Sequence, residues 1–276
     1  MTNELERVAT PVAQVATHIG QATAVEQARA VAEVQAAIVV AQQVPRDMDR
    51  AIGEMRDACG RLALANRAFY SVPNRGNGPS VHLARELARI WGNVQYGVHE
   101  LRRDDERGES EVQAFAWDVQ TNTRSTRTFV APHARMKNKR REKLVDLGDI
   151  YLSNQNIGAR AVRECIFTML PTWFTEEAQD ICHQTLQNGE GEPLPDRITN
   201  MIAAFNGIDI SVDQMEHKLG RKRGAWTASD VAQMAISYTS ITRDGVNKDE
   251  EFPPQRVTTD EITARAAPSD ADPRDE

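Results

Sequence analysis

The sequence predicts an α+β fold, in which a short three-stranded antiparallel β-meander packs against helices and a small helical module follows at the C-terminal side. Three observations predict this class. Apolar residues recur at helical spacing before residue 94, and they alternate with a period of two between residues 94 and 130. Beyond residue 154 the helical spacing returns, with interruptions at proline and glycine residues.

The helices predicted before the meander are separated by residues that end a helix. Pro45 cannot continue a helical backbone, and Ser80 is a residue type that caps a helix start. A Gly- and Pro-rich segment favours a loop. The helices are predicted over residues 22–43, 48–68 and 80–91, and the loop over residues 71–79.

The predicted meander consists of three strands joined by polar turns. Val94, Tyr96 and Val98 alternate with Gln95, Gly97 and His99, as the strands of a half-buried sheet do. A charged loop over residues 102–109 and a turn over residues 121–123 separate the strands. The second strand is predicted over residues 112–119 and the third over residues 126–130.

Composition divides the rest of the chain into parts. Helices are predicted over residues 154–170 and 175–186, and Pro171 separates them. The end of the chain is acidic, Pro-rich and poor in apolar residues, which is typical of disorder. The predicted parts are a helical arm at residues 1–45, the α+β core at 46–190, a helical module at 191–252 and an acidic tail at 253–276.

The bulk composition favours a protein of a reducing compartment. The 276 residues are 40% hydrophobic and 26% charged, and no apolar stretch approaches the roughly 18 residues of a membrane helix. No secretion signal is recognised at the N-terminus. The three cysteines, Cys59, Cys165 and Cys182, show no metal-binding spacing, so we expect buried thiols and a cytoplasmic location.

The chain carries no enzyme signature, and we expect a protein that is not an enzyme and needs no cofactor or metal. It has no phosphate-binding GxxxxGK[ST] motif, no HExxH motif and no paired Cys or His spacing suited to zinc. Asp104, Asp105 and Glu106 leave open a two-metal nuclease. Adjacent acids in a loop are usually only solvated, and no upstream residue completes such a site.

A basic run after the meander indicates nucleic-acid binding, although the net charge is −7. Charge acts where it is concentrated, and a cluster of Lys and Arg neutralises phosphates without sequence preference. The alternative is a solvated loop. The run holds Arg135, Lys137, Lys139, Arg140, Arg141 and Lys143, and the neighbouring segments add Arg124, Arg127, Arg160 and Arg163.

Two further features bear on a binding surface. Phe115 and Trp117 share one side of the second predicted strand, where they either stack on bases or form the core under the helices. The segment 74–79 runs into a capped helix, so its backbone N–H groups either hold a phosphate or belong to a flexible connection.

Four segments carry a resemblance to a family: Glu33–Arg46, Gly78–Asn93, Ala116–Asn122 and Ala159–Pro171. In these segments the chain resembles the RecT, Redβ and Erf group of phage single-strand annealing recombination proteins. The C-terminal part, from Phe205 to Phe252, is similar to a small helical tail on phage recombination proteins.

The resemblance implies a function and a set of partners. It implies ATP-independent binding of single-stranded DNA and annealing of complementary strands in phage recombination. It also implies a homo-oligomeric ring or filament in the cytoplasm of a bacterial host, with no membrane contact. A phage exonuclease or a host single-strand-binding protein is the implied partner.

The expected DNA-binding residues combine the basic pattern with the resemblance. By position, the resemblance selects basic residues on the helix after Ser80, at the start of the basic run and on the helix over residues 154–170. The full set is Arg85, Arg89, Arg124, Arg127, Arg135, Lys137, Lys139, Arg140, Arg141, Arg160, Arg163 and Trp117. Two alternatives remain at this point: a phage structural or scaffolding protein without DNA affinity, and a nuclease or nuclease accessory.

Overall fold

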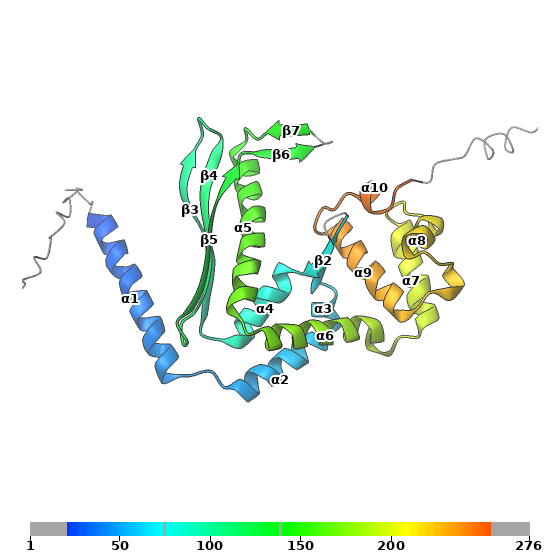
Figure 1. The fold of residues 1–276 in the computed structure, drawn as a ribbon, viewed down its shortest axis with the longest axis horizontal. Helices are drawn as coiled ribbons and strands as arrows, with labels where there is room; N and C mark the ends of the chain where they lie inside the picture. The colour runs from blue at the N-terminus through cyan, green and yellow to red at the C-terminus, as the bar shows by residue number, and fades with distance from the viewer. Residues whose placement is uncertain (1–20, 74–75, 138–139, 255–276) are drawn as a thin grey trace, which may run out of the picture. The chain divides into compact units, whose positions relative to one another are not determined.

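The computed structural model describes residues 21–73, 76–137 and 140–254 (Figure 1). The chain divides into two compact units, Met1–Pro45 and Arg46–Glu276. The disorder predicted for the acidic tail falls, from residue 255 onward, outside the described residues. Within the described part, no helix is both long enough and apolar enough to cross a membrane.

The first unit holds helix α1 (Gln21–Gln43), which confirms the helix predicted over residues 22–43. Arg29 forms ion pairs with Glu33, one turn ahead, at 2.9 Å and with Glu26 at 3.9 Å. Such pairs support an exposed helix by a few tenths of a kcal/mol each.

The described part of the second unit contains helices and seven strands, and the strands form three separate sheets (Figure 1). Its helices are α2 (Met48–Cys59), α3 (Leu62–Ala65), α4 (Val81–Trp91), α5 (Leu147–Met169), α6 (Thr172–Asn188), α7 (Leu194–Asn206), α8 (Val212–Leu219), α9 (Ala228–Thr242) and α10 (Lys248–Glu251). Its strands are β1 (Phe69–Val72), β2 (Gly76–Pro79), β3 (Val94–Asp104), β4 (Glu109–Asp118), β5 (Thr123–Pro132), β6 (Ala134–Lys137) and β7 (Arg140–Lys143).

The largest sheet is the predicted three-stranded antiparallel meander, in the order β3-β4-β5. The α+β fold class is therefore confirmed. The strands run further than predicted, since β3 continues to Asp104 through an irregularity between Glu100 and Arg102. The alternation of β4 is plain: Val112, Ala114 and Ala116 are buried, and the residues between them are at least partly exposed.

Helix α5 packs on the buried face of this sheet and contacts all three strands (Figure 1). Small side chains on β4, such as Ala114 and Ala116, let the helix approach closely. Gly158 marks the closest approach, because a Cβ atom there would lie 2.9 Å from Cγ1 of Val98 on β3. Leu83, Leu87, Ile166 and Phe174, from α4, α5 and α6, complete this core. The three cysteines are free and buried, as predicted.

The C-terminal helices enclose a second apolar cluster around Phe205, Met215, Met234 and Phe252. This part is tied to the first core, because Ala232 and Ile236 of α9 pack there. Polar contacts add to the connection, because Ser71 of β1 donates its backbone N–H to Ser240 Oγ at 2.8 Å and its hydroxyl to Glu251 Oε1 at 3.4 Å. Within the C-terminal part, Glu251 also accepts from Lys218 Nζ at 2.7 Å and Ser237 Oγ at 3.0 Å.

Two β-hairpins differ from the predictions. The prediction of a loop over residues 71–79 is wrong for most of that segment, because strands β1 and β2 pair there. Gly76, with φ of 87°, has the backbone conformation that a tight turn requires. The basic run forms β6 and β7, a hairpin in a segment where the sequence predicts no strand.

Three predicted helix boundaries are also wrong. The helix predicted from residue 154 begins seven residues earlier, at Leu147, where Asp146 caps it. The helix predicted over residues 48–68 ends at Cys59, and a short helix restarts at Leu62. Thr175 does not begin a helix, because α6 starts at Thr172 directly after Pro171. The capping of α4 by Ser80 is confirmed, with its Oγ accepting from the His82 backbone at 3.1 Å.

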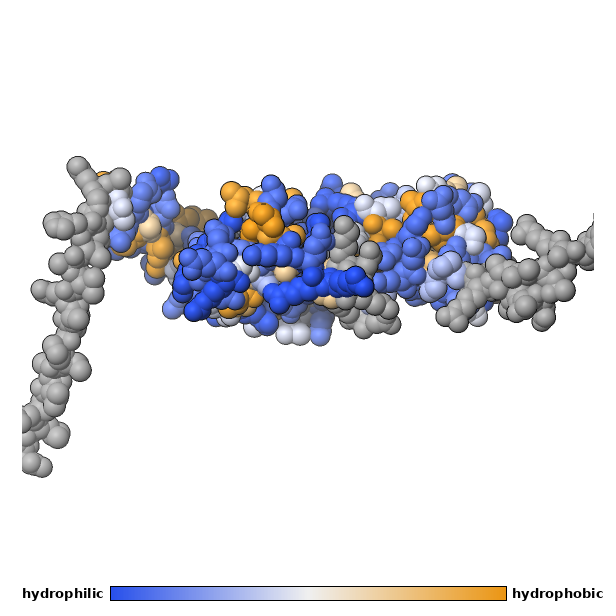
Figure 2. All heavy atoms as spheres, turned by 90° about the horizontal axis from the view of Figure 1, so that it is seen from above, coloured by the Kyte–Doolittle hydropathy of each residue, from blue (hydrophilic) through white to orange (hydrophobic). Residues whose placement is uncertain are grey.

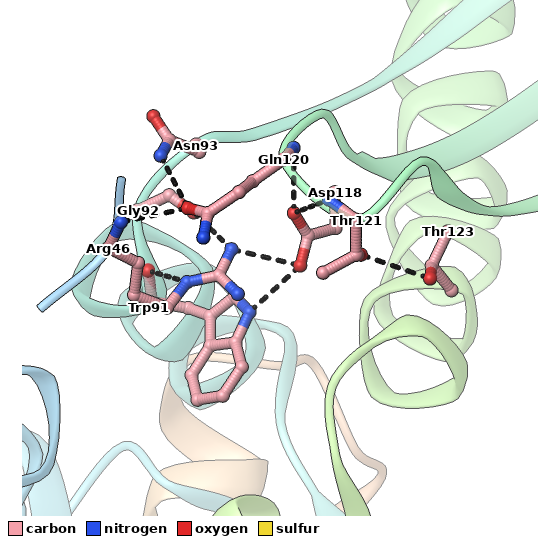
Figure 3. Close-up of polar contacts among 8 residues, drawn as sticks. All are labelled: Arg46, Trp91, Gly92, Asn93, Asp118, Gln120, Thr121 and Thr123. Carbon is pink, nitrogen blue, oxygen red and sulfur yellow. Dashed lines mark hydrogen bonds and ion pairs between the residues drawn. The ribbon is translucent and has the colours of Figure 1, made fainter. Parts of the chain in front are cut away.

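A buried ion pair closes the base of the sheet (Figure 3). Arg46 and Asp118 each have side chains 5% exposed, and Arg46 Nη2 lies 2.9 Å from Asp118 Oδ2. Arg46 also donates to the carbonyls of Trp91, at 2.7 Å, and Gly92, at 3.1 Å, and its guanidinium lies 4.3 Å from the Trp91 ring centre. The Trp91 indole donates to Asp118 Oδ2 at 3.1 Å.

The second oxygen of Asp118 organises the turn between β4 and β5. Asp118 Oδ1 accepts from the backbone N–H groups of Gln120 at 3.0 Å and Thr121 at 3.2 Å. Burial alone raises the pKa of this carboxyl, but the hydrogen bonds from Arg46, Trp91 and the turn outweigh it and leave the pKa below its usual value. The cluster therefore joins the start of α2, the end of α4 and the β4–β5 turn.

Replacing this carboxyl tests the ion pair. Because the folded-state pKa of Asp118 is lowered, the pair contributes stability above the unfolded pKa of about 4 and loses it as pH falls through the folded pKa. Asp118→Asn should lower the free energy of unfolding at pH 7 by about 3–5 kcal/mol, the usual result of leaving one buried charge unpaired. Urea denaturation at several pH values measures this.

The pH profile separates this pair from a general effect of losing a carboxylate. The difference between wild type and Asp118→Asn should stay constant from pH 7 to about pH 5 and shrink below about pH 4. Asp57→Asn, at an exposed position on α2, is the control and should change little. A loss for Asp118→Asn no larger than that for the control would contradict the role of the pair.

The close approach at Gly158 leads to a second stability prediction. Gly158→Val should lower the free energy of unfolding by about 1–3 kcal/mol, because the new methyl groups overlap with Val98. A Cβ atom on Gly53 of α2 would meet no atom within 4 Å, so Gly53→Ala is the matched control and should gain up to about 1 kcal/mol from helix propensity. Thermal and urea denaturation of both variants check the opposite signs.

Candidate nucleic-acid interface

A groove lies between β5 and α5, along the outer edge of the sheet. Its volume is about 530 Å³. Arg127, Thr128 and Phe129 line it from β5, and residues of α5 line the other side. Those residues are Ile157, Arg160, Ala161, Arg163 and Glu164.

Helical and strand periodicity explain why the arginines converge there. Arg160 and Arg163 are three residues apart on α5, so they share a face, as predicted. On β5, Arg127 shares its face with Phe129, which packs against the core under α5. Three predicted DNA-binding residues therefore meet in one groove.

The three arginines differ in their partners. Arg163 donates to Glu164 Oε1 at 2.7 and 3.1 Å, and its guanidinium lies 4.7 Å from the Tyr70 ring centre. Arg127 and Arg160 are exposed, and within the described chain no carboxylate lies within ion-pair distance of either. Among the described residues, two positive charges of the groove thus have no acidic partner, and Glu164 neutralises the third.

The basic run lies on the β6–β7 hairpin, which follows β5 along the chain. Arg140 and Arg141 are exposed, whereas Arg135 pairs with Glu142 at 3.5 Å and Asp149 at 3.9 Å. The side chain of Lys137 and all of Lys139 lie outside the described residues. In the view of Figure 2, the surface around the β6–β7 hairpin is mainly hydrophilic, and exposed hydrophobic side chains lie where α5 begins.

The predicted residues on α4 are set apart from the groove. Arg89 pairs with Glu86 and Glu54, both at 2.8 Å, and these hydrogen bonds raise the pKa of its guanidinium. Arg85 is exposed on the same helix. The predicted phosphate clamp over residues 74–79 is, in its described part, strand β2 paired with β1.

Arg124 and Trp117 lie on the opposite face of the sheet from Arg127. Arg124 is opposite Trp117 in the β4–β5 register, and its guanidinium carbon lies 6.0 Å from the Trp117 ring centre. Phe115 lies on the same face, and both rings are partly exposed. The alternative that these rings form the core under helices is wrong for the second unit. The β4 residues that face the helices are Ala114 and Ala116, not Phe115 and Trp117.

The acidic loop and one buried Ser–His pair carry residue types that occur in catalytic sites. Asp104 pairs with Arg102 at 2.9 Å and Asp105 with Arg103 at 2.7 Å. Among the described residues no cluster of three His, Cys, Asp or Glu side chains suits a metal ion. Ser110 Oγ lies 2.8 Å from His133 Nε2, but the serine is 0% exposed, so a substrate cannot reach it. This hydrogen bond therefore serves the fold.

The sequence pattern assigns no role to His99, whose ring is stacked on Phe115 with centroids 5.2 Å apart. The alternation of β3 does contain a signal, because it puts His99 on the same face as Gln95 and Gly97. Tyr70 has no such signal, since it lies at the edge of the predicted loop and its contact with Arg163 joins distant parts of the chain.

Comparison with known proteins finds no family model, curated protein or solved structure that matches this chain. The resemblance to the RecT, Redβ and Erf group therefore stays a prediction. Three of the segments that carry it contain Arg46, Trp91 and Asp118, the members of the buried cluster in Figure 3. These three segments thus include residues that hold the fold together.

Proposed function

We propose that this protein binds single-stranded DNA without ATP and anneals complementary strands in phage homologous recombination. The groove between β5 and α5 is the observation that carries the proposal. It places the guanidinium groups of Arg127 and Arg160 at an open surface with no carboxylate partner in the described chain. Phosphate oxygens are the ligands that exposed, unpaired guanidinium groups favour.

The hairpin follows the groove closely along the chain. Five residues lie between Thr128 in the groove and Ala134 at the start of the hairpin, so at the usual strand rise the two are at most about 20 Å apart. A strand that contacts Arg127 and Arg160 in the groove can therefore continue toward Arg140 and Arg141. Binding of this kind releases counterions and needs no net positive charge on the whole protein.

Annealing follows from neutralising the backbone while leaving bases free to pair. Neutralised phosphates on one strand lower the repulsion that a complementary strand meets, and base pairing supplies the driving free energy. A homo-oligomeric ring or filament, a phage exonuclease or host single-strand-binding protein as partner, and the host cytoplasm as location belong to the same proposal. It assigns the protein no enzymatic activity.

Reversing the two free charges in the groove tests the proposal. Arg127→Glu/Arg160→Glu should weaken binding of a labelled single-stranded oligonucleotide at least about tenfold at moderate salt. The slope of log affinity against log salt should become shallower by about 0.7 for each phosphate that the variant no longer neutralises. Fluorescence anisotropy over a salt series measures both quantities, and a strand-annealing assay without ATP or magnesium measures the activity.

The control changes the same charge elsewhere. Arg50→Glu/Arg61→Glu alters exposed arginines on or beside α2 and α3, which do not line the groove. Equal effects of the two double variants would refute the groove as the binding site. Wild-type protein without salt-dependent affinity would favour the structural or scaffolding alternative, and magnesium-dependent cleavage lost on changing Asp104 and Asp105 would favour the nuclease.

Removing the acid in the groove should have the opposite effect. Glu164→Gln frees the Arg163 guanidinium from its ion pair, so oligonucleotide affinity should rise by about three- to tenfold and the salt slope should steepen. The same anisotropy titration measures this. Glu176→Gln, an exposed acid on α6, is the matched control for net charge. An equal gain in both variants would show that only total charge matters.

A further inference from the structure

The face of the β3-β4-β5 sheet turned away from α5 carries a row of rings and one guanidinium. His99 and Phe115 stack nearly parallel, with an interplanar angle of 3°. The Arg124 guanidinium carbon lies 5.4 Å from the Phe115 ring centre and 6.0 Å from that of Trp117. In Figure 1 no helix of the second unit's described part lies on this face.

The row is held in place by its neighbours. Gly97 is opposite Phe115 in the β3–β4 register, and a Cβ atom there would lie 3.1 Å from the Phe115 ring. Glycine therefore gives the ring room to lie over β3. At the other end, the Trp117 indole donates to Asn122 Oδ1 at 3.1 Å, which orients its ring at the β4–β5 turn.

Apart from Gly97 and Arg124, the residues opposite and beside the rings are polar and uncharged, and the nearest carboxylate on this face of β4, Glu111, lies four residues from Phe115. Gln95 is opposite Trp117, Thr126 is opposite Phe115, and Gln113 donates to Thr128 at 3.2 Å. No carboxylate of the described chain pairs with Arg124. Such a surface suits flat ligands with polar edges and a negative charge nearby, because rings and guanidinium planes stack on flat π-systems.

We propose that this face, the ring platform of His99, Phe115, Trp117 and Arg124, is a second binding surface that takes unpaired nucleobases by stacking. Bases stack on aromatic rings and on guanidinium planes in single-strand recognition. Trp117 and Arg124 are the groups that meet the bases, and Phe115 with His99 positions Arg124. The inference rests on the proposed function for its ligand, but on different residues.

The platform discriminates between single-stranded DNA and duplex. Only an unpaired, unstacked base has a free face to offer, so a strand leaves the platform when it pairs. The groove, in contrast, contacts phosphates, which single strands and duplex both carry. The two surfaces therefore contribute differently: one holds the strand by charge, and the other favours its unpaired state.

A double-change cycle tests the platform, in which the bases are removed from the probe and the rings are removed from the protein. The probes are labelled oligothymidylate and an abasic oligomer of the same length, which keeps the phosphates and lacks the bases. Wild-type protein should bind the first about fivefold or more tightly than the second, the equivalent of one stacked base. Phe115→Leu/Trp117→Leu should bind both equally, with a salt slope like that of wild type.

Two further variants serve as controls. Phe115→Tyr/Trp117→Tyr retains flat rings and should retain the preference for the oligomer with bases. Trp173→Leu removes a tryptophan that is 46% exposed on α6 and should leave the preference unchanged. Circular dichroism and denaturation of each variant confirm that the fold is intact.

The outcomes distinguish this inference from the proposed function. A preference for the oligomer with bases that persists in Phe115→Leu/Trp117→Leu overturns the platform. If that variant keeps the preference and changes only the oligomeric state, the face is covered by a second copy of the chain instead. If Arg127→Glu/Arg160→Glu has no effect while the cycle behaves as expected, the platform stands and the groove falls. Wild-type protein that binds neither oligomer overturns both.

Discussion

The close packing of α5 on one face of the meander is the constraint on which the rest of the structure depends. Ala114 and Ala116 on β4 and Gly158 on α5 leave no room between sheet and helix for a large side chain. Tight contact of this kind is sensitive to single methyl groups. It aligns the arginine-bearing face of α5 with the edge of β5, and it leaves the bulky aromatic residues of β4 to the other face.

The buried cluster of Arg46, Trp91 and Asp118 plays a supporting part at the end of the sheet. It connects segments that are 27 to 72 residues apart in sequence, through hydrogen bonds of Arg46 to backbone carbonyls and of Arg46 and Trp91 to the Asp118 carboxylate. A charge pair buried to this degree is tolerated because each group is satisfied on several sides. The segments that carry the predicted resemblance to phage annealing proteins thus include residues that specify the fold.

Periodicity predicts most of the large elements and little of the small ones. The meander is predictable because Val94, Tyr96 and Val98 alternate with polar residues, and α4 because Ser80 and Gly92 mark its ends. The β1–β2 hairpin escapes prediction because Gly and Pro residues favour loops locally, whereas backbone pairing with β1 overrides that preference. The β6–β7 strands carry hardly any apolar residues, so they show no alternation.

The candidate site is predictable in residue type but not in arrangement. Arg160 and Arg163 are expected to share a face, because helix geometry is local. The pairing of Arg89 with Glu54 and of Arg135 with Asp149 joins residues from different elements, which no local pattern indicates. Arg124 and Arg127 fall together in the predicted basic set, although an odd separation along a strand places them on opposite faces.

That odd separation has a consequence for the polymer itself. Because β5 is an outer strand, Arg124 and Arg127 stand on either side of the same rim of the sheet. Under the proposed function, a polynucleotide could touch both arginines only by bending round that rim, and short fragments would occupy one side at a time. The apparent site size, in nucleotides, would then depend on fragment length, and chain stiffness would become a property that the protein selects.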